Sequence, residues 1–313
     1  MATLPEVLTD LHDESEALDR LVSRLSDVDW SRPTPAAGWT IAHQISHLAW
    51  TDHASTLAAS DPAEFGRLVA RAFEEPESFV DRAAAEGVVP PPELLARWRD
   101  GREALAKALT AMPAGDKLPW FGTAMSALSS ATGRLMETWA HGQDVADTLA
   151  GEGSQTGAAA RELRQPTARL RHIAHIGYRT IAHGFAAHGR PAPDEPFRVE
   201  LSTADGALWT FGPADASDRI TGPALDFCLL VTQRRHPVDL ALQSTGEAAR
   251  EWLTVAQAFA GPPGSGREPG SNREPGNREP GSNREPGNRE AGSNREAGNN
   301  REAGNGNEPR VTS

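Results

Sequence analysis

The sequence is nearly free of cysteine, with Cys228 the single one in 313 residues. One cysteine excludes an internal disulfide framework and a metal site built from several cysteines, and it fits a reducing cytoplasm. The amino-terminal segment has no basic stretch followed by an apolar one, so we expect no signal peptide. Uninterrupted apolar runs stay well short of the ~18 residues that a membrane span needs. We therefore expect a cytoplasmic protein without a membrane partner.

Positive charge is also scarce. Lysine and arginine total 31 against 43 aspartates and glutamates, a net charge of −12. Such a charge balance excludes a protein that binds the phosphate backbone of nucleic acids without sequence preference, and it disfavours docking to an anionic membrane. Glycine-rich phosphate loops and a nucleophile elbow around Ser126, Ser129 or Ser130 are missing too. Nucleotide binding by those loops and a serine-hydrolase mechanism are therefore not expected.

Large apolar residues disappear after Gly261, and valine, leucine and isoleucine do not return until Val311. This segment repeats the unit N-R-E-P/A-G, with eight arginines and eight glutamates between Arg267 and Arg310. A repeat without an apolar position has nothing to bury and cannot offset its ordering entropy. We predict that residues 263–313 form a disordered low-complexity tail that takes no part in the chemistry.

Residues 1–151 carry helical periodicity. Apolar residues at three- and four-residue steps predict four amphipathic helices, which span 4–25, 40–59 with Thr40 as N-cap, 92–110 and 125–149. Four helices with connections of this kind predict a helical bundle.

Residues 152–262 combine helical and alternating patterns. A helical segment at 158–188 precedes PFRVEL and ALWTFG, whose turn-rich spacer predicts a β-hairpin. Helices are expected in ALDFCLLVTQRR and EAAREWLTVAQAFAG, with a possible strand in VDLAL between them. The predicted fold class is thus α+β: a four-helix bundle over 1–151, a linker helix and small α+β domain over 152–262, and the tail.

Two pairs of residues with metal-binding side chains are spaced four apart: His43 with His47, and Glu137 with His141. On a helix each pair shares one face and can direct two donor atoms at one centre, as in three-ligand zinc sites. The helix of Glu137 and His141 has its apolar face on the opposite side, so a solvated face with an ion pair is the alternative. The helix of His47 is apolar all round, which favours buried histidines with polar partners.

Other chemistry-bearing residues have plainer interpretations. Cys228 lies in an apolar run and is expected to be a small buried residue, not a nucleophile. Several tryptophans are expected to line the bundle interior or a pocket. A further group could form an anion-binding stripe or simply a solvated helix face; it comprises His172, His175, His183, His188, Arg169, Arg171 and Arg179.

The sequence resembles the DinB-like, mycothiol-dependent maleylpyruvate isomerase family in two motifs. These are GWTIAHQISHLAW and, about ninety residues later, ETWAHGQDVADTL. The carboxy-terminal part resembles the sterol-carrier-like α+β domain appended in that family, in the segments TGPALDFCLLVTQRRH and GEAAREWLTVAQAFAG. Within the family, the chain resembles a metal-binding branch most. The resemblance covers residues 5–262.

The resemblance implies a divalent metal, typically zinc, held by His47, Glu137 and His141. His43 stands where relatives often carry aspartate, and it would be a second-shell partner or an alternative ligand. The family isomerase holds its dicarboxylate substrate with an arginine from the carboxy-terminal domain, and Arg234 and Arg235 are the nearest match. A guanidinium fork suits a carboxylate.

Three functions remain open at this stage. The first is a mycothiol-dependent S-transferase or isomerase, in which a thiolate bound to the metal attacks an electrophilic carbon. Its partners would be a small-molecule thiol and an electrophilic substrate. The second is a metal-dependent hydrolase that needs no thiol. The third is a non-enzymatic protein that binds a metal or carries a ligand on the apolar surface of its carboxy-terminal domain.

Overall fold

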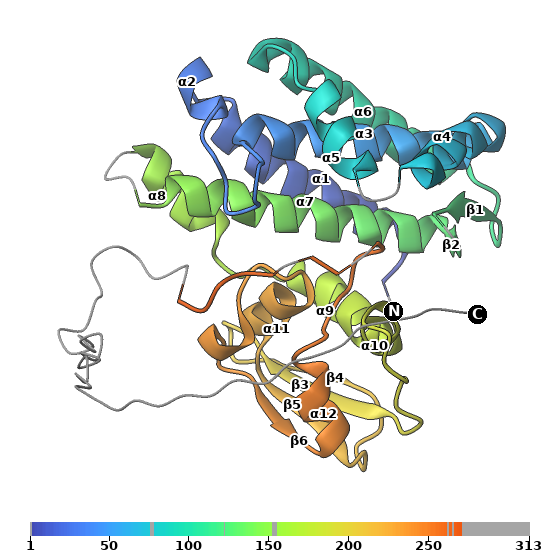
Figure 1. Ribbon diagram of the computed structural model, residues 1–313, viewed down its shortest axis with the longest axis vertical. Helices are drawn as coiled ribbons and strands as arrows, with labels where there is room; N and C mark the ends of the chain where they lie inside the picture. Colours follow the sequence, from blue (N-terminus) through green and yellow to red (C-terminus); the bar gives the residue numbers. More distant parts are fainter. Residues whose placement is uncertain are drawn as a thin grey trace, which may run out of the picture. The chain divides into compact units, whose positions relative to one another are not determined.

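Four long helices form the amino-terminal part of the chain in the computed structural model (Figure 1). Residues 2–75, 78–121, 123–151, 155–261, 263–264 and 266–270 are described. The long helices are α1 (Leu4–Val22), α3 (Ile41–Ser60), α6 (Pro91–Ala111) and α7 (Ala127–Leu149). Helix α3 packs against α6 and α7, and α1 packs against α7. The predicted four-helix bundle is confirmed.

Shorter elements that the periodicity did not predict connect these helices. They are α2 (Asp27–Trp30), α4 (Pro62–Glu74), α5 (Phe79–Glu86) and the antiparallel pair β1 (Lys117–Trp120) and β2 (Thr123–Ser126). Helix α4 buries Phe65 and Ala72, and α5 buries Ala84. Helix α4 does carry an apolar stripe at helical spacing, formed by Phe65, Leu68, Val69 and Ala72, and this pattern could have predicted it. Helix α5 spans only eight residues, which is too short for such a stripe to stand out.

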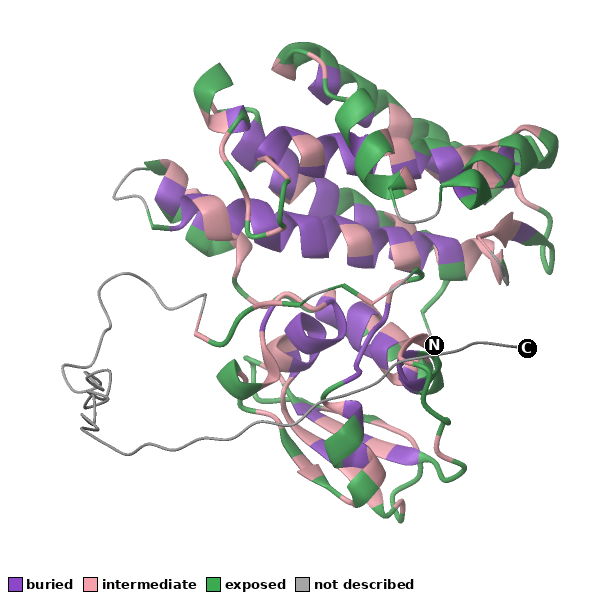
Figure 2. Ribbon diagram, viewed as in Figure 1, coloured by how far each residue is buried: buried purple, intermediate pink, exposed green. Residues whose placement is uncertain are grey.

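Helix α7 is buried along almost its whole length (Figure 2). Leu135 and Trp139 pack in the hydrophobic core, whereas His141 and Asp144 are also buried on the other side of the helix. A solvated face, the alternative considered for this side, is therefore wrong. The helix contacts α1, α3 and α6 of the bundle and also α8 and α9.

The carboxy-terminal part is a small α+β fold. Its four-stranded sheet has the order β4-β3-β5-β6, in which β3 is antiparallel to β4 and parallel to β5, and β6 is antiparallel to β5. The strands are β3 (Phe197–Ser202), β4 (Leu208–Phe211), β5 (Asp218–Pro223) and β6 (Gln243–Thr245). The helices are α8 (Gln155–Leu163), α9 (Leu170–Arg179), α10 (Ile181–Ala187), α11 (Ala224–Val231) and α12 (Glu247–Trp252). The predicted hairpin is confirmed as β3–β4.

One local prediction holds in part and two were wrong. The 158–188 segment is helical as predicted, but it is divided among α8, α9 and α10. Residues Pro237–Asp239 of the VDLAL region form a short 3-10 helix, and the strand follows later as β6. The last helix ends at Trp252, far short of Gly261: turn hydrogen bonds from the Thr254 and Val255 N–H groups follow it, and the Ala258 N–H then donates to the Val231 carbonyl.

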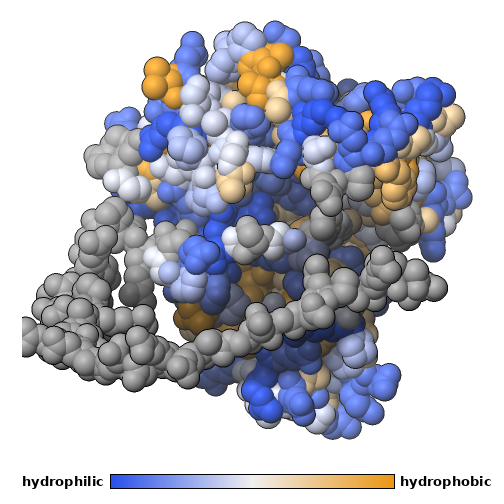
Figure 3. Space-filling model, viewed as in Figure 1, coloured by the Kyte–Doolittle hydropathy of each residue, from blue (hydrophilic) through white to orange (hydrophobic). Residues whose placement is uncertain are grey.

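None of the described helices is both long enough and apolar enough to cross a membrane. The face in Figure 3 is mostly hydrophilic, and hydrophobic side chains gather there in a few separate patches. Most of the apolar side chains instead fill two clusters, one within the bundle and one that continues from the bundle into the sheet domain.

Candidate metal centre

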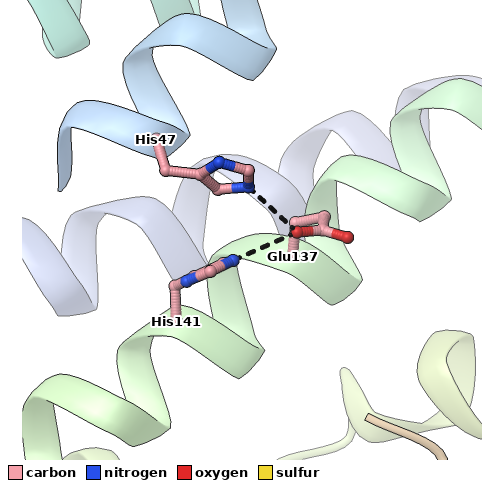
Figure 4. A group of neighbouring side chains, drawn as sticks. All are labelled: His47, Glu137 and His141. Atoms are coloured by element: carbon pink, nitrogen blue, oxygen red, sulfur yellow. Dashed lines mark hydrogen bonds and ion pairs between the residues drawn. The ribbon is translucent and has the colours of Figure 1, made fainter. Parts of the chain in front are cut away.

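His47, Glu137 and His141 lie together between α3 and α7 (Figure 4). One ligand atom from each of the three lies within 4.8 Å of the other two. Glu137 Oε2 is 3.2 Å from His141 Nε2 and 3.5 Å from His47 Nε2. The histidines are 7% and 8% exposed, whereas the Glu137 side chain is 25% exposed. Both imidazoles therefore point at one carboxylate that is open to solvent on one side.

The two helices place these side chains by simple geometry. Glu137 and His141 are one helical turn apart on α7, so they lie on the same face. Helix α3 packs against α7 and brings His47 to that face. The imidazole centroids of His47 and His141 are 4.6 Å apart.

A chain of hydrogen bonds fixes the tautomer of His141. The Thr34 hydroxyl donates to the Trp39 carbonyl at 2.9 Å, so its oxygen accepts the Gln44 amide N–H at 2.8 Å. The Gln44 amide oxygen therefore faces His141 Nδ1 and requires a proton there. The lone pair of the neutral imidazole is left on Nε2, where it points at Glu137.

The pKa shifts give the same protonation states. Burial lowers the pKa of His141 to about 3, with the nearby positive charge of Arg234 adding to the effect. Burial by itself would raise the pKa of Glu137, but the contacts with His141 and His47 outweigh it and hold that pKa well below its ordinary value. At neutral pH the centre thus combines an ionised carboxylate with a neutral His141 imidazole.

This arrangement suits a divalent cation. A neutral imidazole lone pair and a carboxylate oxygen 3.2 Å apart repel each other unless a positive charge lies between them. His47 Nδ1 is buried without a hydrogen-bond partner among the described residues, so its ring is held by packing. The site offers three ligands, two imidazole nitrogens and one carboxylate, and solvent can reach the carboxylate. Catalytic zinc sites use three-ligand sets of this kind.

Aromatic side chains surround the two histidines. The Trp39 ring stacks on His141 at a centroid distance of 5.8 Å and lies 5.2 Å from the His47 ring. Trp39 is anchored by its indole N–H, which donates to Asp81 Oδ1 at 2.8 Å. The Trp50 ring lies 6.0 Å from His47 on its other side. These rings lower the local dielectric and strengthen electrostatic interactions at the centre.

His43 does not join the three clustered side chains. Its Nδ1 lies 2.8 Å from the Thr40 hydroxyl and accepts the Thr40 backbone N–H at 3.3 Å, a reciprocal arrangement at the start of α3. The structure thus gives His43 a helix-capping contact, and the residue that contacts His141 from the second shell is Gln44.

Arg234 and Arg235 both form ion pairs with α7. Arg235 binds the Asp147 carboxylate with two hydrogen bonds of 2.7 and 2.8 Å. Arg234 lies 3.2 Å from Asp144 and also donates to the backbone carbonyls of Ala140 and Thr232. Of the pair, Arg234 is the one whose charge lowers the pKa of His141.

The remaining candidates have structural roles. Cys228 is fully buried, and burial raises the pKa of its thiol, as expected for a residue that is no nucleophile. The proposed stripe is divided between two helices, and two of its members bind acidic residues of α1: Arg169 donates to Glu14 at 2.6 Å, and His172 lies 2.7 Å from Asp10.

Sequence reasoning missed Gln44 and the role of Trp39. Gln44 lies three residues before His47, so helical spacing alone places the two on one side of α3. This spacing could have identified Gln44 from the sequence. The Trp39 position depends on the loop before α3, which the sequence pattern does not specify.

Comparison with known proteins supports one family. Residues 11–146 match the family described as the mycothiol maleylpyruvate isomerase N-terminal domain. Residues 193–245 match a family described as wyosine base formation, so a sterol-carrier-like carboxy-terminal domain stays a prediction. Two uncharacterised proteins of Mycobacterium tuberculosis, from strains CDC 1551 / Oshkosh and ATCC 25618 / H37Rv, are each 51% identical over 268 residues, which is 85% of this chain and 100% of theirs.

Solved structures share the fold. The crystal structure of a mycothiol-dependent maleylpyruvate isomerase matches with a TM-score of 0.51 and 16% identity, over 84% of this chain and 97% of that chain. A histidine-to-alanine mutant of that enzyme matches with a TM-score of 0.50. The amino-terminal match and the mycobacterial relatives place the chain in the mycothiol-dependent maleylpyruvate isomerase family, and the solved structures share its fold.

Proposed function

We propose that the chain binds a divalent metal ion through His47, Glu137 and His141 and uses it in a reaction between a small thiol and an electrophile. The observation that carries the proposal is the convergence of two imidazole nitrogens on one ionised carboxylate at 3.2 and 3.5 Å. Zinc is the metal that such a donor set favours, because imidazole and carboxylate ligands suit it and no cysteine is nearby.

The solved structures with this fold are of mycothiol-dependent enzymes, so we propose mycothiol as the thiol. When bound, a divalent cation lowers the pKa of a coordinating thiol and favours its nucleophilic thiolate. The thiol proton leaves to solvent, and the sulfur adds to a carbon–carbon double bond conjugated to a carbonyl, whose π electrons move onto that carbonyl as an enolate. In an S-transferase the enolate takes a proton from solvent and the adduct is the product. In an isomerase the new single bond rotates, the enolate collapses to restore the double bond, and the thiolate leaves.

The chain's own residues would shape this reaction in three ways. Gln44 holds the His141 ring through Nδ1, which fixes its direction. Trp39 and Trp50 keep water from the histidines. Arg234 is the better candidate of the arginine pair to face a substrate carboxylate, because its charge acts on His141.

Metal content is the first test. Elemental mass spectrometry on untagged protein should find about one zinc per chain in the wild type and none in His47→Ala, Glu137→Ala or His141→Ala. His43→Ala is the matched control, since it changes a histidine on the same helix and should retain the metal. Wild-type protein that stays metal-free after zinc reconstitution, or ligand variants that keep the metal, would overturn the proposal.

Thiol dependence is the second test. Zinc-loaded protein should consume a maleyl-type electrophile only with mycothiol present, and His141→Ala should lose at least about a hundredfold in rate. Turnover without thiol would identify a hydrolase instead. Metal binding without turnover of either kind would favour the non-enzymatic alternative.

A further inference from the structure

Aromatic side chains continue outward from His47 on the α3 side of the metal centre. The Trp50 ring, whose centroid is 6.0 Å from that of His47, lies edge-on to the Phe79 ring at 5.5 Å. The Phe121 ring is 6.4 Å from both Trp50 and Phe79. We call these three side chains, Trp50, Phe79 and Phe121, the aromatic wall. Each of them is partly exposed, so ring surface close to the centre is open to solvent.

Core packing does not account for the aromatic wall. Trp50 and Phe79 belong to neither of the two hydrophobic clusters that the described residues form, whereas Phe121 packs against one of them. Apolar rings that are gathered in one place and remain in contact with water are typical of a binding site. Because the aromatic wall begins beside His47, a molecule that covers it also reaches the metal centre.

Two hydrogen bonds hold Phe79 in its place. Phe79 is the first residue of α5, and α5 packs against α3. The buried Ser46 hydroxyl of α3 donates to the Ala84 carbonyl at 2.6 Å, and the indole N–H of Trp39, just before α3, donates to Asp81 at 2.8 Å. These bonds attach α5 to the segment that also carries His47, so the position of Phe79 relative to the metal centre is fixed.

Phe121 is anchored from another part of the bundle. It comes directly after β1, and its ring lies edge-on to Trp120 at 5.2 Å and to the buried Phe65 of α4 at 5.5 Å. Three separate parts of the chain, α3, α5 and the end of β1, therefore contribute one ring each to the aromatic wall. Rings that are already held in place need little further ordering when a ligand binds, which favours affinity.

The chemistry of the aromatic wall disfavours a strongly polar group. Phenyl rings have no hydrogen-bond donor or acceptor, so a carboxylate or a sugar hydroxyl placed against them loses its bonds to water without replacement. An aromatic or aliphatic group gains free energy by leaving water and by contact with the rings. Arg234, the candidate for a substrate carboxylate, instead reaches α7 at Ala140 and Asp144. This division suits a molecule with an apolar group at one end and a carboxylate at the other.

We propose that the aromatic wall receives an aromatic or other apolar group of the electrophile, so that the substrate is a monocarboxylate with such a group and not a small dicarboxylate. This inference rests on the proposed function, because the aromatic wall acts on the electrophile that reaches the metal centre. Phe79 is the main specificity-determining residue, since its ring is partly exposed and lies outside both hydrophobic clusters of the described residues.

Binding of two unreactive analogues tests the aromatic wall without turnover. N-Benzylsuccinamate and N-methylsuccinamate share a carboxylate and an amide and differ only by a phenyl ring. Isothermal titration calorimetry on the zinc-loaded full-length chain should give a Kd about tenfold lower for the benzyl compound. Equal Kd values, or no binding of either compound at millimolar concentration, would overturn the inference.

Variants assign the preference to the aromatic wall. Phe79→Ala should reduce the tenfold ratio of Kd values to about twofold, and Phe79→Leu, which keeps an apolar side chain, should retain most of it. Phe73→Ala is the matched control, because it removes a phenyl ring that is 69% exposed on α4 and should keep the full ratio. A full ratio in Phe79→Ala, or a reduced one in Phe73→Ala, would contradict the role of Phe79.

Turnover separates this inference from the proposed function. With mycothiol, the reactive counterparts N-benzylmaleamate and N-methylmaleamate should be consumed with the same preference in kcat/KM. Tighter binding of the benzyl analogue without consumption of either maleamate would support the aromatic wall and overturn the proposed reaction. Consumption of both maleamates at equal kcat/KM would overturn the aromatic wall alone. Phe79→Ala that raises the KM for mycothiol and keeps the preference would assign the rings to the thiol, which also overturns it.

Discussion

Among the described residues, α3 and α7 together form two carboxylate centres, and the two centres have different partners. Glu137 of α7 faces His47 and His141. Asp52 of α3 instead receives the Arg134 Nε–H at 2.9 Å, with both side chains less than 5% exposed. His47 and Asp52 are five positions apart on one helix, yet the two centres have different chemistry.

The difference lies in where the positive charge comes from. Arg134 is permanently charged and neutralises Asp52 within the fold, so that centre needs no ligand. The imidazole of His141 is neutral at pH 7, since burial lowers its pKa to about 3, so Glu137 lacks a fixed counter-charge. A buried carboxylate faced by histidines is thus the better predictor of a metal site than a buried carboxylate alone.

The largest effect on stability is expected from Arg134→Met. It leaves Asp52 buried without its partner, and burial already raises the pKa of that carboxyl. We expect a loss of about 4 kcal/mol in the free energy of unfolding, measured by urea denaturation. The double variant Arg134→Met with Asp52→Leu should regain most of it, because no charge is left buried. A double variant as unstable as the single one would show that the ion pair is not the cause.

A smaller effect is expected at a more exposed cluster, where Asp19 of α1 meets two arginines of α6. Asp19 pairs with Arg99 and Arg102 at 2.6 and 2.9 Å. Burial raises the pKa of Asp19, but the two arginines outweigh it and lower that pKa overall. The stabilisation is therefore present above the unfolded pKa of about 3.9 and is lost as the pH falls through the folded value.

Asp19→Asn should accordingly cost about 2 kcal/mol at neutral pH, less than a fully buried pair because Arg99 is half exposed. The difference from wild type should shrink as urea titrations are repeated below about pH 4. Glu16→Gln is the matched control on the same helix, since Glu16 lies 3.4 Å from Arg102 but is exposed. A cost that does not change with pH would contradict an ionic origin.

Gln44→Leu should act on the metal centre and not on the fold. It removes the acceptor for His141 Nδ1–H, so we expect about a tenfold loss of zinc affinity in competition with a chromophoric chelator. Gln44→Glu keeps an oxygen at that position and should recover most of the affinity. Equal affinity in the leucine variant and the wild type would remove Gln44 from the centre.

The smallest effect is expected from His43→Ala. Its contacts are with Thr40 at the start of α3, so we expect a cost of about 0.5 kcal/mol in stability and no change in zinc affinity. Loss of zinc from this variant would restore His43 as a ligand or second-shell residue.

Much of the fold follows from local patterns. The apolar spacing of α1, α3, α6 and α7 predicted each of them to within a few residues, and Thr40 was predicted as the N-cap of α3. Helix α4 was missed although Phe65, Leu68, Val69 and Ala72 follow helical spacing, whereas the eight residues of α5 are too few for a clear pattern. The short strand β6 was misplaced because its pairing with β5 depends on distant residues, not on its own sequence.

The sequence by itself determined which residues could act together within one helix. Glu137 and His141 share a face because they are one turn apart, and Gln44 and His47 do so for the same reason. Only the tertiary structure decided that these two helices meet, which side of α7 is buried, and which acids are neutralised by arginine. Arg234, Arg235 and Arg267 reach α7 from segments far along the chain. Burial and counter-charge depend on such contacts, because a side chain's pKa and bonding follow from what packs around it and not from its neighbours in sequence.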